Sequence, residues 1–170
     1  YDARIADRAE HWLVDHAQDE KPWALFASFV NPHPPFVAPQ ECFDLYSVDE
    51  MPLPVDWEES DWPRHPALER MRRYFGWEEA FSAEAIRQAT ATYYAQCTYA
   101  DQKIGQVLTS LERNGLADST RIIYTSDHGA MVGARGLWGK FTLYDDSCAV
   151  PLIVAGPDVP AGKVVQTPVS

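Results

Sequence analysis

Cysteine is scarce in this sequence, and the cysteines that occur form no familiar site pattern. The 170 residues include three, at Cys42, Cys97 and Cys148. An odd number at irregular spacing predicts neither a disulfide framework nor a zinc site. We therefore expect reduced thiols, with Cys97 and Cys148 buried.

Positive charge is also in short supply. The sequence has 14 Lys and Arg residues against 25 Asp and Glu residues, which gives a formal net charge of −11. Because nucleic acids attract clustered Lys and Arg, this balance argues against a nucleic-acid partner. It leaves room for an anionic small substrate, since one positive pocket can form inside an acidic protein.

Membrane-spanning apolar runs and a signal peptide are missing as well. We therefore expect no membrane partner, and we favour a cytoplasmic location while a periplasmic or secreted one stays open. The chain begins at Tyr1 and ends at Ser170 without a stop-like structure, so we expect a piece of a longer protein. Hydrophobic residues make up 46% of the sequence, which is enough for the core of one domain.

Three apolar runs and one apolar stripe predict an α/β fold with a mainly parallel sheet and helices packed on it. The runs at 23–30, 121–126 and 151–155 are expected to be strands, the first buried on both faces. The stripe predicts a long helix over 82–114, with Ser82 as its N-cap.

Two further segments frame these elements. Residues 2–18 predict a surface helix for which Asp2 is available as an N-cap. Residues 40–80 are acidic, rich in proline and tryptophan, and without periodicity, which predicts an irregular insertion with short helical pieces. Its tryptophans can stack on a substrate or pack the insertion onto the domain, and we assign them no role.

Four polar side chains stand where such a fold places a site. Asp127 and His128 directly follow the second predicted strand, His33 follows the first, and Lys140 lies on a glycine-flanked loop. Ligands of open α/β sheets bind beyond the carboxyl ends of the strands, so these side chains should line one cleft. A carboxylate and an imidazole for a metal, with a lysine for an anion, outline a site that hydrolyses a charged ester.

Each of these residues also has a simpler structural explanation. Asp127 can cap backbone amides of a turn, with His128 as its solvated neighbour. His33 can belong to an ordinary proline-rich turn, and Lys140 can be one of many exposed lysines. The pentapeptide at 125–129 alone does not decide between the two interpretations.

Several sequence blocks, taken in order, are more specific than any single motif. They are Asn31-Pro32-His33-Pro34-Pro35-Phe36, Tyr93 to Leu108, Ser126-Asp127-His128-Gly129, Gly136-Leu137-Trp138-Gly139-Lys140 and Val150 to Val154. Together they resemble the carboxyl half of the catalytic domain of the sulfatase family, in the alkaline-phosphatase superfamily. The Asp-His form resembles the choline-sulfatase-like and phosphonate-monoesterase-like branches.

The resemblance implies a partial alkaline-phosphatase-like layered sandwich that cleaves a small-molecule sulfate ester. Asp127 and His128 are the implied ligands of a divalent cation, Lys140 the contact to the sulfate, and His33 the histidine near the ester oxygen. Hard oxygen ligands favour calcium, whereas an imidazole keeps manganese or zinc open. Hydrolysis of phosphonate monoesters or phosphodiesters is the neighbouring chemistry in the superfamily.

The sequence departs from the family pattern in two ways. Ala130 stands where an acidic residue usually follows Asp-His-Gly. In addition, no cysteine begins the Cys/Ser-x-Pro-x-Arg motif whose Cys or Ser becomes the formylglycine nucleophile, and the amino-terminal aspartate pair is missing.

From these departures we expect residues 1–170 to be a single partial catalytic domain. Such a fragment should bind a metal weakly or not at all and show no turnover by itself. Its incomplete sheet should expose apolar edges, which favours association into a homo-oligomer. A non-catalytic domain that keeps the fold for binding or assembly is the alternative.

Overall fold

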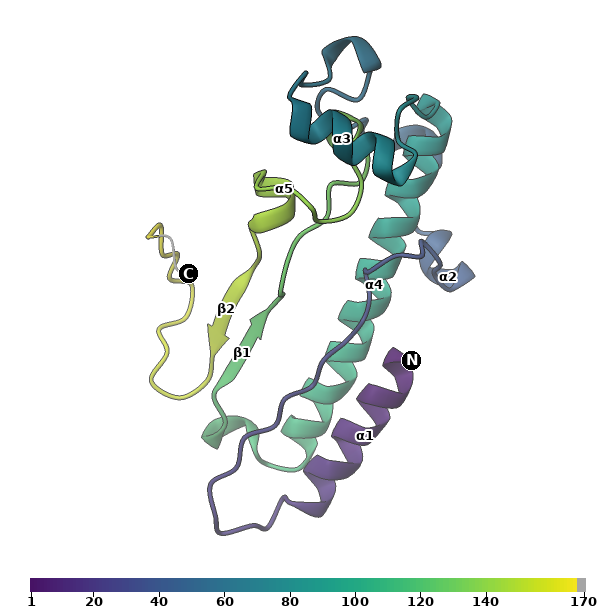
Figure 1. Ribbon diagram of the computed structural model, residues 1–170. Helices are drawn as coiled ribbons and strands as arrows, with labels where there is room; N and C mark the ends of the chain where they lie inside the picture. Colours follow the sequence, from purple (N-terminus) through teal and green to yellow (C-terminus); the bar gives the residue numbers. More distant parts are fainter. Residues whose placement is uncertain (168–170) are drawn as a thin grey trace.

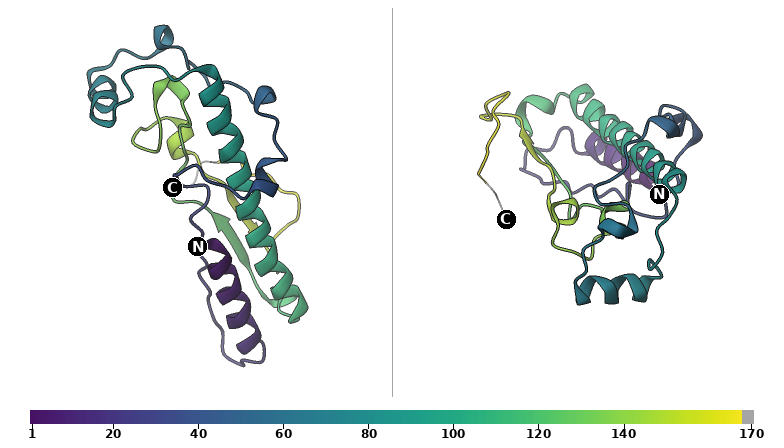
Figure 2. Two further views of the ribbon diagram at one scale, coloured as in Figure 1. Left: turned by 90° about the vertical axis from the view of Figure 1, so that its right-hand side faces the viewer. Right: turned by 90° about the horizontal axis from the view of Figure 1, so that it is seen from above.

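The computed structural model describes residues 1–167, and the last three positions of the expected single domain, 168–170, lie outside the described residues. In chain order the elements are α1 (Asp2–Asp15), α2 (Gln40–Phe43), η1 (Val48–Glu50), η2 (Glu59–Asp61), α3 (Pro66–Phe75), α4 (Ala83–Arg113), η3 (Ala117–Ser119), β1 (Ile122–Thr125), η4 (Ala134–Gly136), α5 (Asp145–Cys148) and β2 (Leu152–Ala155). Figure 1 shows α4 extending along most of the molecule, with α1 beside its carboxyl-terminal half. Figure 2 shows the same pairing of α1 and α4 from two further sides.

Helix α4 confirms the long helix expected over 82–114. Ser82 is its N-cap, because the Ser82 hydroxyl accepts a hydrogen bond of 3.1 Å from the Ala85 N–H. The small residues Ala91, Ala95 and Ala100 are buried along its length and let neighbouring segments approach closely. Helices α1 and α2 both lie against this helix.

Helix α1 buries one face, with Ala6, Ala9 and Leu13 at the spacing of three and four residues that lines up one side of a helix. It ends at Asp15, three residues before the expected end. The expectation that Asp2 caps this helix is wrong, because Tyr1 holds the N-cap position. The Asp2 carboxylate is buried and bonds to a distant part of the chain instead.

Strands β1 and β2 occupy the second and third predicted strands but pair antiparallel, with Ile122 opposite Ala155 and Thr125 opposite Leu152. The prediction of a parallel sheet is therefore wrong for this pair. A parallel pair needs a crossover connection that carries the chain back to the same end. The chain after β1 forms loops and the short helix α5 instead, so β2 starts where β1 ends and runs back along it.

The first predicted strand, over 23–30, is not a strand in the structure. The segment carries no sheet pairing, and Phe26 is 90% exposed, so the expected burial on both faces is also wrong. An apolar run predicts burial, but a strand also needs a neighbouring strand with which to exchange hydrogen bonds. The described residues provide this segment with no such neighbour.

The main buried cluster lies outside the sheet. Met131, Ala134 and Leu137 are almost fully buried, and the partly buried residues that pack against them are Leu68, Met71, Trp77 and Tyr144. The cluster joins α3 to the loop that precedes Lys140. Residues 40–80 thus contribute α2, η1, η2 and α3, joined by irregular segments.

The cysteines differ from the expectation, because Cys42 is buried whereas Cys97 and Cys148 are exposed. Cys97 lies on α4 and Cys148 ends α5, and neither belongs to the buried cluster. Among residues 1–167, no helix has both the length and the apolar character that crossing a bilayer requires.

Candidate functional site

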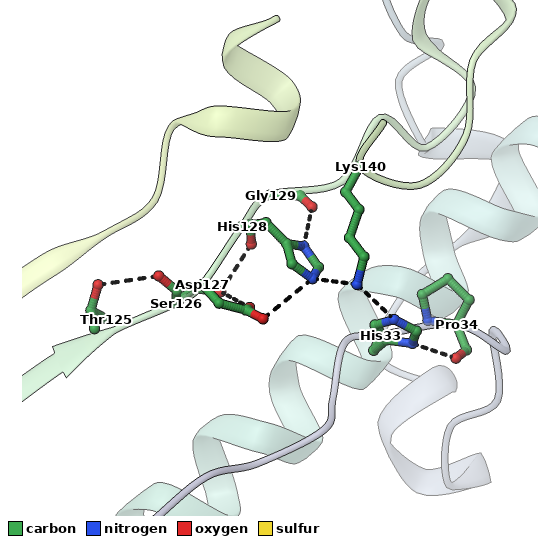
Figure 3. A network of polar contacts seen from close by, with 8 residues as sticks. All are labelled: His33, Pro34, Thr125, Ser126, Asp127, His128, Gly129 and Lys140. Carbon is green, nitrogen blue, oxygen red and sulfur yellow. Dashed lines mark hydrogen bonds and ion pairs between the residues drawn. The ribbon is translucent and has the colours of Figure 1, made fainter. Parts of the chain in front are cut away.

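Lys140 is the meeting point of the predicted site residues. Its Nζ lies 2.7 Å from Nε2 of His128 and 3.1 Å from Nε2 of His33 (Figure 3). An ammonium group has donors and no acceptor, so both ring nitrogens must accept and therefore carry no proton. The structure thus brings together residues that lie 107 positions apart in the sequence.

The two histidines share one tautomer. Nδ1 of His128 lies 2.8 Å from the Gly129 carbonyl oxygen, and Nδ1 of His33 lies 2.7 Å from that of Pro34. Because a carbonyl oxygen only accepts, each Nδ1 must donate. A histidine whose Nδ1–H is held by a carbonyl is oriented to offer the Nε2 lone pair to a metal or a proton donor.

The Asp127 carboxylate lies beside the His128 ring. Its Oδ2 lies 3.5 Å from Nε2 of His128, and its side chain is 85% exposed against 27% for His128. The Ser126 hydroxyl donates to the His128 carbonyl at 2.9 Å, which braces the turn directly after β1. Asp127 and His128 therefore offer one oxygen and one nitrogen toward the same exposed point.

Gly129 allows this turn to lie against α5. Its N–H donates to the Ser147 carbonyl at 2.8 Å, and a Cβ at position 129 would overlap the Asp146 carbonyl oxygen. The glycine after Asp-His is therefore needed for close backbone approach and not only for a turn.

The loop that carries Lys140 is closed by its own backbone. The Met131 N–H donates to the Gly139 carbonyl at 2.8 Å, and the Gly133 N–H donates to the Leu137 carbonyl at 2.9 Å. With Leu137 fully buried, these bonds fix where the chain emerges at Lys140. The loop also touches the one that carries His33, since the rings of Phe36 and Trp138 are 6.1 Å apart.

The Tyr93 phenol, which packs against Phe36, stays neutral. The ring of Tyr93, on α4, meets the ring of Phe36 edge to face at 6.5 Å. Burial, followed by the neighbouring Cys97 thiol, raises the pKa of Tyr93 to about 12. Tyr93 therefore adds no negative charge near a site that is expected to receive an anion.

Two buried polar residues touch the loop that carries His33, and the sequence analysis assigned neither of them to the site. Asp2 was expected at a helix N-terminus, and Gln96 lies within the helix expected over 82–114. Both are at least 98% buried. The available signal was a glutamine beside the apolar stripe of that helix, which predicts an internal hydrogen bond but not its partner.

Asp127 and His128 fit part of a metal site. In the described part of the chain, no three His, Cys, Asp or Glu side chains come close enough together to hold an ion. The pair supplies one carboxylate and one imidazole in the tautomer that a metal requires, whereas calcium takes about six to eight ligands. The donor chemistry fits a divalent cation whose other ligands come from elsewhere.

Comparison with known proteins shows the family of this chain. The family model described as Sulfatase matches residues 1–170. The chain belongs to the sulfatase family. This confirms the resemblance drawn from the ordered blocks of the sequence.

Individual relatives match most of this chain. It is 34% identical over 166 residues to a choline-sulfatase of Rhizobium meliloti, a match that includes 94% of this chain and 32% of the relative. It is 35% identical over 163 residues to the multifunctional alkaline phosphatase superfamily protein PehA of Trinickia caryophylli, with 88% and 32% covered. The chain therefore spans about a third of the length of these relatives.

Solved structures show the same relationship. The chain is similar to the phosphonate monoester hydrolase SpPMH of Silicibacter pomeroyi, with a TM-score of 0.81 and 31% identity over 99% of this chain and 36% of that one. The helix-rich α/β arrangement is thus that of part of a sulfatase of the alkaline-phosphatase fold.

Proposed function

We propose that this chain carries part of the active site of a sulfuric-ester hydrolase, in which Lys140 and His33 contact the substrate and Asp127 and His128 ligate a divalent cation. The observation that supports this most is the convergence of two Nε2 lone pairs on the Lys140 ammonium. The formylglycine nucleophile and the remaining ligands are proposed to belong to the rest of a full-length protein.

Lys140 is proposed to bind the sulfate group. In the structure its ammonium donates to two neutral ring nitrogens. A charged oxygen is a stronger acceptor than a neutral nitrogen, so a bound sulfate ester should draw at least one of these donors to itself. A single ammonium at this point also gives an otherwise acidic chain the local positive charge that an anionic substrate needs.

His33 is proposed to protonate the departing oxygen. Its Nδ1–H stays on the Pro34 carbonyl, and Nε2 becomes free to carry a proton once Lys140 turns to the sulfate. As the nucleophile bonds to sulfur and the bond between sulfur and the ester oxygen breaks, that oxygen takes the proton that Nε2 has received from solvent. The ring is then left neutral, in the tautomer that the structure shows.

Asp127 and His128 are proposed to hold the cation through the carboxylate and Nε2, which the Lys140 ammonium has to release before the ion binds. When bound, the cation supplies positive charge that orients a nucleophile and stabilises charge developing on the sulfuryl group. Calcium is the first choice for a site completed by carboxylates, with manganese or zinc as alternatives because one donor is an imidazole. Two ligands alone should hold any of these ions weakly.

Phosphonate monoester hydrolysis is the second candidate. It is favoured by the structural similarity to a phosphonate monoester hydrolase at a TM-score of 0.81. Both substrates present a tetrahedral anion and an ester oxygen, so Lys140 and His33 would act in the same way on either.

Paired substrates with one leaving group separate these functions. The full-length protein, supplied with divalent cation, is assayed with 4-nitrophenyl sulfate and with 4-nitrophenyl phenylphosphonate, so that only the anion differs. We expect the larger kcat/KM for the sulfate. The reverse preference would favour the phosphonate function, and hydrolysis of neither ester would favour a non-catalytic domain.

A further inference from the structure

The loop that carries His33 depends on partners outside itself. Pro32, Pro34 and Pro35 have no N–H, so the loop lacks three of the donors that a turn normally uses to satisfy its own carbonyls. The His33 N–H closes the turn by donating to the Val30 carbonyl at 2.9 Å. Side chains of two helices bond to several of the other polar groups of the loop.

Asp2, from α1, binds the start of the loop. Its two carboxylate oxygens accept from the Val30 N–H at 2.9 Å, from the Asn31 N–H at 2.9 Å and from the Asn31 side-chain Nδ2 at 2.7 Å. The residue is 1% exposed. Burial by itself raises the pKa of Asp2, but the three donors, together with the positive charge of the Tyr1 amino group, outweigh it, so the pKa lies below its ordinary value and the carboxylate is charged.

Gln96, from α4, binds the end of the loop. Its Nε2 donates to the carbonyl of His33 at 3.3 Å and to that of Pro35 at 3.1 Å. The reverse orientation of the amide would place Oε1 against two carbonyl oxygens, so the geometry fixes which end faces the loop. Gln96 is 2% exposed, and its Oε1 has no partner among the described residues.

We infer that Gln96 and Asp2 are positioning residues for His33, an inference that rests on the proposed role of His33 in sulfate-ester cleavage. Gln96 donates to the carbonyls on either side of Pro34, whose own carbonyl accepts a hydrogen bond from Nδ1–H of His33. The direction of Nε2 toward Lys140 therefore follows from where α4 places this segment. Asp2 fixes the approach to the loop in the same way from α1.

Gln96→Met tests the inference, because it keeps the length of the side chain and removes both donors together with the unpartnered Oε1. Thr90→Val is the matched control: Thr90 is buried on the same helix, but its hydroxyl donates at 2.9 Å to the Ile86 carbonyl within α4. In the full-length protein we expect Gln96→Met to lower kcat about 10- to 100-fold, since small misplacements of a reacting group cost this much. KM, metal content and the thermal unfolding midpoint should stay close to those of Thr90→Val.

A double-mutant cycle with His33→Ala separates positioning from a general structural effect. If Gln96 acts through His33, Gln96→Met should have almost no further effect on kcat once His33 is gone. The loss should also be larger for an alkyl sulfate than for 4-nitrophenyl sulfate, because a poorer leaving group needs the proton more. Asp2→Asn should also lower kcat, by a smaller factor, and this loss should likewise disappear in the His33→Ala background.

An equal loss of kcat from Gln96→Met in the wild-type and His33→Ala backgrounds would overturn the positioning inference and leave the proposed function intact. A wild-type protein without sulfatase activity, or an active His33→Ala variant with unchanged kcat, would overturn both. Should Gln96→Met fail to fold, Gln96→Asn withdraws the same donors by one methylene and is expected to give the same non-additive result.

Discussion

The rings of His33 and His128 are each oriented by a hydrogen bond to the carbonyl of the next residue. Because the carbonyls of Pro34 and Gly129 accept hydrogen bonds from Nδ1–H of His33 and His128, the tautomer of each ring is set locally. The meeting of the two rings is not local, since Lys140 reaches them from a third segment. The tautomer of each histidine therefore follows from its own motif. The meeting of His33, His128 and Lys140 depends on how the fold positions the three loops that carry them.

Acidification should reveal the buried charge of Asp2. Its folded-state pKa is lowered, so the stabilisation is fully present above the unfolded value of about 4 and is lost as the pH falls through the folded value. We expect Asp2→Asn to cost about 1–3 kcal/mol of unfolding free energy at pH 7, because it removes an ionic acceptor of buried donors. Urea titrations from pH 7 down to pH 3 measure this.

The stability of Asp2→Asn should also depend less on pH than that of the wild type. Wild type should lose stability faster than Asp2→Asn as the pH falls below about 4, since only wild type has this carboxylate to protonate. Parallel pH curves for the two proteins would show that Asp2 is not held as a charged group.

The sequence predicts candidate site residues that belong to short motifs, but it does not predict the side chains that bond to the loop carrying His33. Asp127, His128 and Lys140 follow a strand or lie between glycines, which are local signals. Gln96 is a single glutamine in a helix of 31 residues, and nothing in its neighbours names the carbonyls of His33 and Pro35 as its partners. Contacts over more than 60 positions depend on the tertiary fold.

At the scale of elements, the insertion at 40–80 supports the loop that carries Lys140. Trp62 packs over Gly136, and the Arg72 guanidinium lies 4.7 Å from the centre of the Trp62 ring while donating to the Arg135 carbonyl at 2.7 Å. Burial lowers the pKa of Arg72 from its usual value, yet an arginine remains charged at neutral pH. The insertion is therefore part of the framework of the site.

Replacing Gly136 should loosen this contact. The residue has a φ of +66°, and a Cβ at this position would overlap the indole ring of Trp62. We expect Gly136→Ala to cost about 1–3 kcal/mol of unfolding free energy through overpacking and strain, and to lower kcat by shifting Lys140. Denaturant unfolding together with sulfate release measures both effects.

Gly105→Ala is the control for this substitution. Gly105 lies inside α4, where an added Cβ meets no atom within 4 Å, so alanine should stabilise the helix by about 0.5–1 kcal/mol and leave kcat unchanged. If Gly136→Ala is as stable and active as Gly105→Ala, the insertion does not hold the loop.

The elements differ in how far the sequence could predict them. The helix over 82–114 follows from its own apolar stripe and its Ser82 cap, so it could be predicted closely. The segment at 23–30 has the composition of a strand, but pairing needs a partner, and no described strand lies beside it. The direction of β2 depends on the loops before it, which carry no periodic signal.

At the scale of the whole molecule, the described chain is a long helix with loops gathered at one end and a narrow, open sheet. Ile123, Leu152 and Ile153 are each more than half exposed on β1 and β2. Such apolar strands are suited to a covering partner, and association through them stays a prediction. The chain spans about a third of the length of the relatives that it matches, and the activity is proposed for a full-length protein.

The central claim is that Asp127 serves the metal and Lys140 serves the substrate anion. Metal content and sulfate release, measured side by side on the full-length Asp127→Ala and Lys140→Ala variants, test it most directly. Asp127→Ala should lose metal and most of the activity, because it removes a ligand. Lys140→Ala should keep its metal and lose turnover, because its ammonium addresses the substrate and not the ion. Loss of metal from the Lys140 variant, or full activity of the Asp127 variant, would contradict the account.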